Sequence, residues 1–172
     1  VRGENRINTT DSLFLKKGMF DDAKYGMKHT IPISTNFKMF KHFSVSLNGN
    51  FEEVWTGSSI LKNDFDVINN TQGEIVTIKG FNRYNQYDFG LSIGTTIYGL
   101  FNFKQGKRIE SIRHVIRPSI SYNTRPSFEK YYDTYIIDAD GNTADYTRFE
   151  DSFFGRPSKV YSSNIGINIS NN

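Results

Sequence analysis

The residues best suited to bind a ligand are two arginines spaced four positions apart. Arg113 and Arg117 would share one face of a β-strand, because every second side chain of a strand points the same way. Three further basic residues come just before them: Lys104, Lys107 and Arg108. Such a basic track can guide a phosphorylated ligand through charge-assisted hydrogen bonds. The alternative is that the arginines pair with carboxylates such as Glu110 or Asp88, which would make their role structural.

No residues are spaced as in a catalytic or metal centre. His29, His42 and His114 lack ligand spacing, and the chain has 0 Cys. The segment 138–142 is similar to a calcium loop, but its glycine comes too early and no glutamate stands at the last ligand position, so we interpret it as a turn. We therefore predict that the chain is not an enzyme and that it has no catalytic residue, no metal and no cofactor.

The two arginines lie in one of five segments that alternate apolar and polar side chains with a period of two. These segments cover residues 25–37, 43–55, 87–101, 112–123 and 160–169. A period of two is typical of β-strands with one apolar and one polar face. The sequence predicts an all-β fold of antiparallel, up-and-down strands.

The connections between these segments are expected to be short at one end of the strands and long at the other. About five residues join the first two segments and about ten join the third to the fourth, whereas the other connections take about thirty and nearly forty. Within the longest connection, residues 131–149 predict a hairpin. Residues 73–78 predict a strand extension or a smaller hairpin.

The apolar faces carry an aliphatic band between two aromatic belts. The band consists of Ile31, Ile33, Val45, Leu47, Leu91, Ile93, Ile116, Ile120, Ile165 and Ile167. The belts consist of Tyr25, Phe37, Phe43, Trp55, Tyr87, Phe101, Tyr122 and Tyr161. Both features are typical of the lipid-facing surface of an outer-membrane β-barrel, whose strands need about 9–11 residues. Five strands are too few for a barrel, which needs about eight or more, so we expect them to pair with strands outside this segment.

Composition excludes several other classes. Lys plus Arg is 21 and Asp plus Glu is 18, and this net charge of +3 is too small to suggest nucleic-acid binding. Hydrophobic residues make up 37% of the chain, and no apolar run approaches the roughly 18 residues of a membrane helix. A soluble β-sandwich also alternates apolar and polar residues, and it remains the alternative fold.

Three blocks of sequence are similar to one known family. They are DAKYGMKHTIPIST at 22–35, EVW at 53–55, and TIYGLFNF at 96–103 followed by IRHVIRPSISY at 112–122, the last being the most specific. These blocks resemble the Bacteroidetes branch of the outer-membrane lipopolysaccharide-assembly family LptD, also called organic solvent tolerance proteins. The resemblance runs from about Asn8 to Ser163.

The resemblance implies a large barrel in the outer membrane of a Gram-negative cell, preceded by a periplasmic jellyroll that residues 1–172 do not contain. The acyl chains of lipopolysaccharide would leave such a barrel through a lateral opening while the sugars cross its lumen. The implied partners are lipopolysaccharide, outer-membrane lipids, a periplasmic transport bridge and an LptE-like lipoprotein plug. Gate strands in another branch contain prolines; here Pro32 and Pro118 fit either a bulge or a weakened seam.

We therefore expect residues 1–172 to be one segment of a multi-pass barrel that conducts lipopolysaccharide, with Arg113 and Arg117 facing the lumen. Other functions stay open on the residues alone. They include a porin, a TonB-dependent receptor, a component of a secretion system, and a soluble β-sandwich that acts as a binding module.

Overall fold

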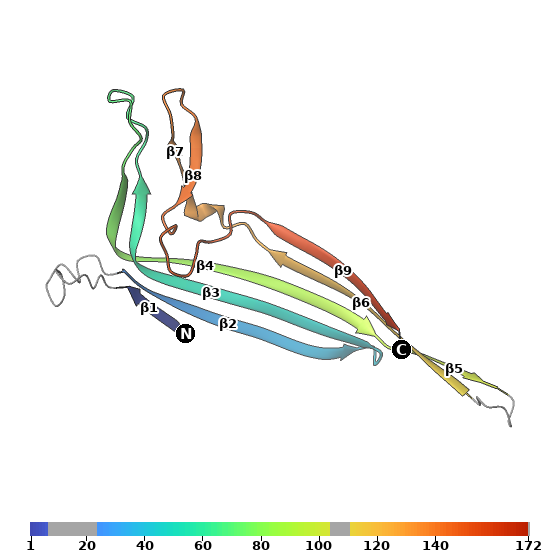
Figure 1. Cartoon of the computed structure of the whole chain (residues 1–172). Helices are drawn as coiled ribbons and strands as arrows, with labels where there is room; N and C mark the ends of the chain where they lie inside the picture. The colour runs from blue at the N-terminus through green and yellow to red at the C-terminus, as the bar shows by residue number, and fades with distance from the viewer. Residues whose placement is uncertain (7–23, 104–110, 172) are drawn as a thin grey trace. The chain divides into compact units, whose positions relative to one another are not determined.

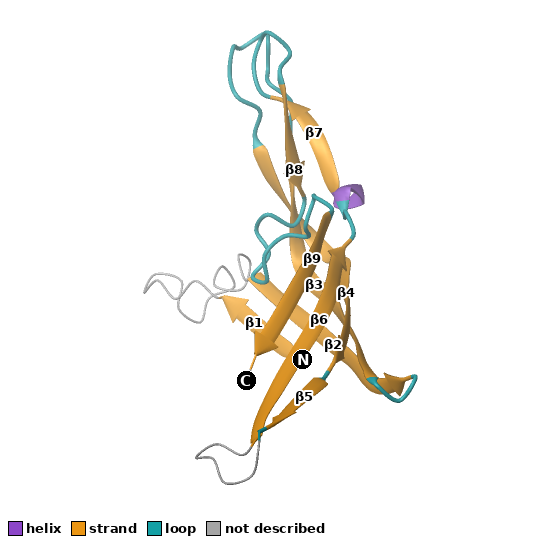
Figure 2. Ribbon diagram, turned by 90° about the vertical axis from the view of Figure 1, so that its right-hand side faces the viewer, coloured by secondary structure: helices purple, strands orange, loops and turns teal. Residues whose placement is uncertain are grey.

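The computed structural model describes residues 1–6, 24–103 and 111–171, and almost all of its regular structure is β (Figure 1). Lys104, Lys107, Arg108 and Glu110 of the predicted basic track lie outside the described residues. The strands are β1 (Arg2–Arg6), β2 (Lys24–Met39), β3 (Phe43–Lys62), β4 (Ile75–Thr95), β5 (Ile97–Asn102), β6 (Ser111–Arg125), β7 (Tyr132–Ile136), β8 (Thr143–Thr147) and β9 (Ser162–Asn171). A single turn of 3₁₀-helix, η1 (Glu129–Tyr131), precedes β7 and is drawn purple in Figure 2. None of the described residues forms a helix that is long and apolar enough to span a membrane.

The larger sheet has seven strands in the order β1-β2-β3-β4-β6-β5, with β9 paired to β6. The pairs β1–β2, β4–β6, β5–β6 and β6–β9 are antiparallel, as the sequence predicts. Within the described residues β1 and β9 are each paired along one side, so the sheet is not closed into a barrel.

The predicted segment 87–101 appears as two strands because the ladder is interrupted at Thr96. The pairs Gly94↔Ser119 and Ile97↔Ile116 keep one register across the interruption, so no residue is inserted and there is no bulge here. In that register Thr96 lies opposite Arg117, and the neighbouring Thr95 lies opposite Pro118, which has no backbone N–H to donate. A residue without a backbone donor therefore stands next to the break in the ladder.

Two strands continue well beyond their predicted ends. β3 runs to Lys62 and β4 begins at Ile75, so the expected connection of about thirty residues shortens to residues 63–74. Alternation fails as a signal in these extensions because both faces carry apolar side chains. In the β3 extension Ile60 is buried on one face and Leu61 lies on the other, and in the β4 extension Tyr84 is buried on one face and Phe81 lies on the other.

The chain divides into two compact units, and each is described by itself. Unit 1 consists of residues 1–31, 51–86 and 127–161, and unit 2 consists of residues 32–50, 87–126 and 162–172. In unit 2, β2 and β3 are joined by a tight turn in which Phe40 and Lys41 have positive φ values of 49° and 64°. This is the short connection that the sequence predicts between the first two segments.

In unit 1 the longest connection, residues 127–161, is a folded lobe. The predicted hairpin is confirmed, because β7 and β8 pair antiparallel from Tyr132↔Thr147 to Ile136↔Thr143. The lobe is held on β3 and β4 by a small aromatic core of Val54, Tyr84 and Phe149, whose exposed fractions are 1%, 1% and 2%. The Tyr84 hydroxyl donates to the Gly155 carbonyl at 2.9 Å.

Candidate functional site

The register of unit 2 separates its side chains onto two different faces. Ile93 pairs with Ile120, and Ile120 pairs with Ile167, so three isoleucines stand side by side across β4, β6 and β9. One position further along, Gly94 pairs with Ser119, and Ser119 pairs with Asn168. Because successive side chains of a strand alternate, the first row forms an apolar face and the second row forms a polar face.

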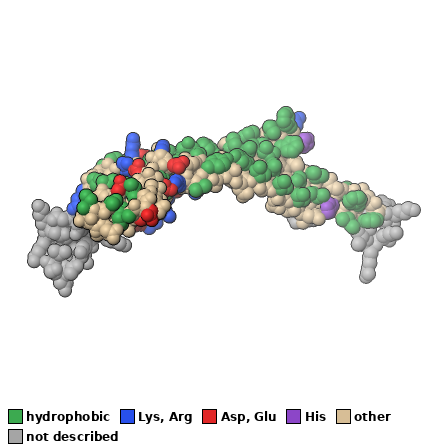
Figure 3. All heavy atoms as spheres, turned by 90° about the horizontal axis from the view of Figure 1, so that it is seen from above, with side chains coloured by type: hydrophobic (Ala, Val, Ile, Leu, Met, Phe, Trp, Pro, Cys, Tyr) green, Lys and Arg blue, Asp and Glu red, His purple; other side chains and the backbone are tan. Residues whose placement is uncertain are grey.

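The apolar face is largely exposed in this chain. Among the predicted lipid-facing residues, Ile31, Ile33, Leu47, Ile120, Ile165 and Ile167 are exposed, Leu91, Ile93 and Ile116 are half-buried, and Val45 is buried. Ile167 alone is 75% exposed. Figure 3 shows one side of the molecule, on which hydrophobic side chains form continuous patches. Apolar surface of this extent marks a contact with a partner or a membrane.

The predicted aromatic belts contain residues that are mostly exposed as well. Phe37, Phe43, Tyr87, Phe101 and Tyr122 in unit 2 are exposed, as are Tyr25 and Tyr161 in unit 1, whereas Trp55 is half-buried. Tyr, Trp and Phe at such positions provide an apolar ring, and Tyr and Trp add a polar tip, which suits them to the boundary between lipid and water.

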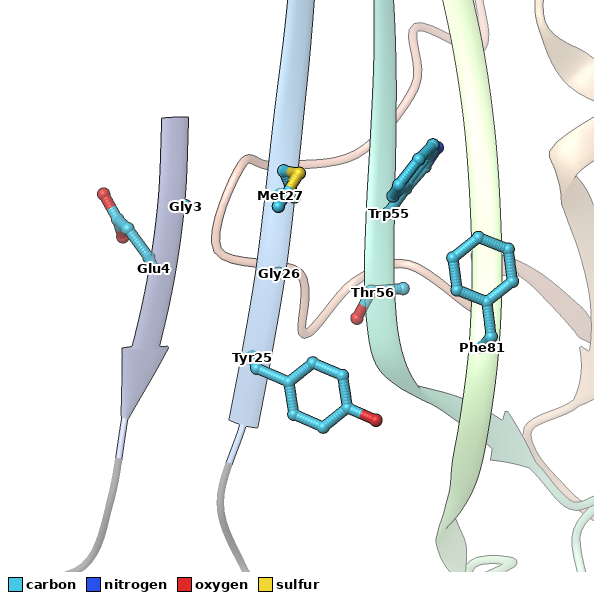
Figure 4. A pocket seen from close by; sticks show the side chains of 8 residues that line it. All are labelled: Gly3, Glu4, Tyr25, Gly26, Met27, Trp55, Thr56 and Phe81. Carbon is cyan, nitrogen blue, oxygen red and sulfur yellow. The ribbon is translucent and has the colours of Figure 1, made fainter. Parts of the chain in front are cut away.

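Trp55 is part of an aromatic pocket on β1–β4 of unit 1 with a volume of about 520 Å³ (Figure 4). Its walls include Tyr25, Met27 and Phe81, and the rings of Trp55 and Phe81 meet edge to face at 5.6 Å. Tyr25 lies over Gly57, where a Cβ would come within 2.1 Å of the tyrosine ring. The buried Trp55 Nε1 has no hydrogen-bond partner among the described residues.

The polar face of unit 2 contains a basic groove of about 480 Å³ that Arg117 lines. Lys38 at the end of β2 and Lys41 and His42 in the following turn line the same groove. Arg113 lies with its guanidinium 4.8 Å from the centre of the Tyr98 ring, and Tyr98 also lines the groove. The structure thus brings Arg117 together with two lysines and places Arg113 on a ring at the groove's margin.

Sequence reasoning missed Lys38 and Lys41. They lie far from Arg117 along the chain, and only the pairing order of the strands brings them to one groove. The sequence did place Lys38 on the polar face, because it has an even number and the even positions of this segment carry the polar side chains. Of the two carboxylates expected as possible partners of the arginines, Asp88 lies 3.8 Å from Arg125, and Glu110 lies outside the described residues.

Asparagine and glycine shape another part of the polar face. Gly90 pairs with Asn123, and a Cβ at Gly90 would come within 2.4 Å of the Asn48 side-chain oxygen and 2.6 Å of that of Asn123. The absent side chain therefore leaves the space in which two amide groups meet. Amides and hydroxyls on a polar sheet face are groups that hydrogen-bond hydrated ligands such as sugars.

The segment 138–142 is confirmed as a turn. Asp138 Oδ1 accepts hydrogen bonds from the backbone N–H of Asp140 and Asn142 at 3.1 and 3.0 Å, and Gly141 has a φ of 80°. The Asn142 side-chain amide donates to Asp138 Oδ2, and this bond chiefly lowers the pKa of the Asp138 carboxyl. The described residues contain no cluster of three or more groups that could hold a metal ion.

A comparison with protein families finds one match. A family model described as "LptD protein" matches residues 1–172. No curated protein and no solved structure matches this chain.

Proposed function

The chain belongs to the LptD family of outer-membrane proteins for lipopolysaccharide transport and assembly, as its sequence blocks predict, and we propose that it is a segment of a transmembrane β-barrel that conducts lipopolysaccharide. The Bacteroidetes branch stays a prediction. In the proposed mechanism the apolar face meets lipid, and the polar face lines a wet lumen that passes hydrated, anionic sugars. The chain would catalyse no reaction.

The observation that carries this proposal is the exposed apolar row of unit 2. Ile120 and Ile167 are paired across β6 and β9, and they are 48% and 75% exposed. Burying a large aliphatic side chain stabilises a protein by about 1.5–3 kcal/mol, so leaving such a row in water would be costly. Hydrocarbon chains remove that cost without any further protein layer.

Ion pairs occur among the described residues of both units. In unit 1, ion pairs include Lys28–Glu52 at 2.8 Å, Lys62–Glu150 at 2.8 Å and Arg83–Glu53 at 3.2 Å. The described residues of unit 2 include the pair Arg125–Asp88 at 3.8 Å. We propose that unit 2 supplies the membrane-crossing part of the strands, because its exposed apolar row suits lipid, where exposed charges would be expensive.

The proposed barrel needs strands beyond those described. Unpaired edges are not tolerated in lipid, and β1 and β9 each leave one edge unpaired within the described residues. We propose that residues 1–172 form one segment of a single barrel domain and that further strands complete it. An LptE-like lipoprotein plug and a periplasmic transport bridge are the proposed partners, and Arg113 and Arg117 are the proposed ligand-facing residues.

Cysteine labelling tests which solvent each face meets. Residues 1–172 contain 0 Cys, so a single cysteine substitution introduces a thiol whose position in this segment is known. We would place the full-length protein in outer membranes and compare Ile33→Cys with Ser34→Cys, and Ile167→Cys with Asn168→Cys. A water-soluble maleimide should label the serine and asparagine positions and spare the isoleucine positions, because adjacent residues point to opposite faces.

The same experiment can refute the proposal. Equal labelling at Ile167→Cys and Asn168→Cys would mean that both faces meet water. Protection of both positions from water-soluble and from lipid-soluble maleimides would place the strand inside a protein core and favour a β-sandwich.

A further inference from the structure

The basic groove on the polar face of unit 2 has a composition that is unusual for this chain. Two lysines, an arginine and a histidine line it, and among the described residues no carboxylate does. The remaining lining residues that carry functional groups are hydroxyls, one amide and Tyr98, all of which can hydrogen-bond an oxygen ligand. A chain with a net charge of only +3 has therefore gathered a local positive charge here.

The groove is formed by parts of the chain that hold each other in place. Lys41 and His42 lie in the β2–β3 turn, and the Thr95 hydroxyl donates to the His42 carbonyl at 2.8 Å, which fixes the turn against the end of β4. Arg117 pairs with Ser170 and Pro118 with Ile169 on the facing strand β9. The cations therefore project from positions that the sheet determines.

Arg113 adds a further cation beside the groove. Its guanidinium stacks on the Tyr98 ring at 4.8 Å, within the range of a cation–π contact. A guanidinium that stacks on a ring by its face keeps the N–H groups at its edge available to a ligand. These donors lie in one plane and match the spacing of phosphate oxygens. Lys38 and Lys41 add positive charges on flexible side chains, which also suit a phosphate group.

We propose that this groove binds a phosphate group of a phosphorylated glycolipid. The inference rests on the proposed conduit function, and it deepens that function by placing a binding site at the short-turn end of the polar face. Lys38, Lys41 and Arg117 are the groups that bind the phosphate directly, and Arg113 supports the local potential from the Tyr98 ring. The phosphate can be carried by the glycolipid or be free in solution, and the experiment separates these sources.

Binding should be measured on the full-length protein in detergent with three probes. These are a bis-phosphorylated acylated disaccharide, the same molecule without its phosphates, and inorganic pyrophosphate. The double variant Lys38→Ala/Lys41→Ala should bind the phosphorylated glycolipid about tenfold more weakly than the parent, because two charge-assisted contacts are lost. Lys38→Arg/Lys41→Arg should retain binding. Lys79→Ala is the matched control, because Lys79 is an exposed lysine on β4 of unit 1 and does not line the groove.

Each outcome decides the proposal. Weaker binding of the phosphorylated glycolipid in the double alanine variant, with the control unchanged, supports it. Unchanged binding in that variant overturns it, as does equal binding of the glycolipid with and without its phosphates. Pyrophosphate bound as tightly as the glycolipid would assign the groove to small soluble anions and would also overturn it. The cysteine-labelling pattern, repeated in the double variant, shows whether the strands are still inserted, so loss of this site can be told apart from failure of the barrel proposal.

Discussion

The attachment of the lobe at residues 127–161 depends on one buried ring, that of Phe149. Phe149 is 2% exposed, and its ring lies 4.8 Å from that of Tyr84 and 5.8 Å from that of Tyr131. Replacing a buried Phe by Ala typically costs about 3–5 kcal/mol. Because the aromatic core is small, we expect Phe149→Ala to release the lobe from β3 and β4 while the strands of unit 2 stay intact.

The neighbouring residue gives a matched control. Arg148 pairs with Asp133 at 3.5 Å, and both side chains are 52% exposed, so losing this pair should cost less than about 1 kcal/mol. The backbone carbonyl of Arg148 accepts from the Ile60 N–H at 3.0 Å, and Arg148→Ala leaves that bond in place.

Hydrogen exchange followed by mass spectrometry measures the difference. In the full-length protein, peptides covering residues 128–149 should exchange about two to four orders of magnitude faster in Phe149→Ala than in the parent, as the loss of about 3–5 kcal/mol requires. Arg148→Ala should change the rate less than about tenfold. Equal rates in the two variants would refute the view that the aromatic core fastens the lobe.

Two further predictions concern the polar face and the hairpin turn. Gly90→Ala should lower the free energy of unfolding by about 1 kcal/mol, at the low end of overpacking costs, because its Cβ would displace the Asn48 and Asn123 amides. Gly99→Ala, whose Cβ would have no neighbour closer than 3.6 Å, should be neutral, and urea unfolding of both variants checks the contrast. The turn at Asp138 should open in acid: its pKa is lowered, mainly by the Asn142 amide, so its contribution to stability is present above the pKa of the unfolded chain and is lost as the pH falls through the lowered pKa. The Asn142 amide signal in NMR should follow this transition, and Asp138→Asn should abolish its pH dependence.

The alternation of apolar and polar residues predicted strands well where one face of the strand is apolar and the other is polar. Ile93, Ile120 and Ile167 were assigned to one face from the sequence, and the register pairs them side by side. It failed in the outer parts of β3 and β4, where Ile60 and Tyr84 are buried on one face while Leu61 and Phe81 lie on the other. A period of two is lost when both faces are apolar, so those extensions were taken for a connection.

The grouping of the cations needed the structure. Arg113 and Arg117 could be placed on one face from their spacing, but Lys38 reaches their neighbourhood only through the pairing order of the strands. Spacing along one chain cannot report such an arrangement, because the separation of strands in sequence does not determine which of them are neighbours. The ring beside Arg113 was missed for the same reason, since Tyr98 is its diagonal neighbour across the β5–β6 pair, where Tyr98 pairs with Val115 and Arg113 with Leu100.

The side on which the lobe packs bears on the choice between a barrel and a sandwich. A β-sandwich covers the apolar face of one sheet with a second sheet. In unit 1 the covered residues are Val54 and Tyr84, at even positions of β3 and β4, while Phe81 at an odd position of β4 is 65% exposed. In unit 2 the apolar odd positions, such as Leu47 at 42% and Phe89 at 58%, are exposed as well. In each unit, therefore, apolar residues at odd positions are exposed, which agrees with the proposal that these positions meet lipid.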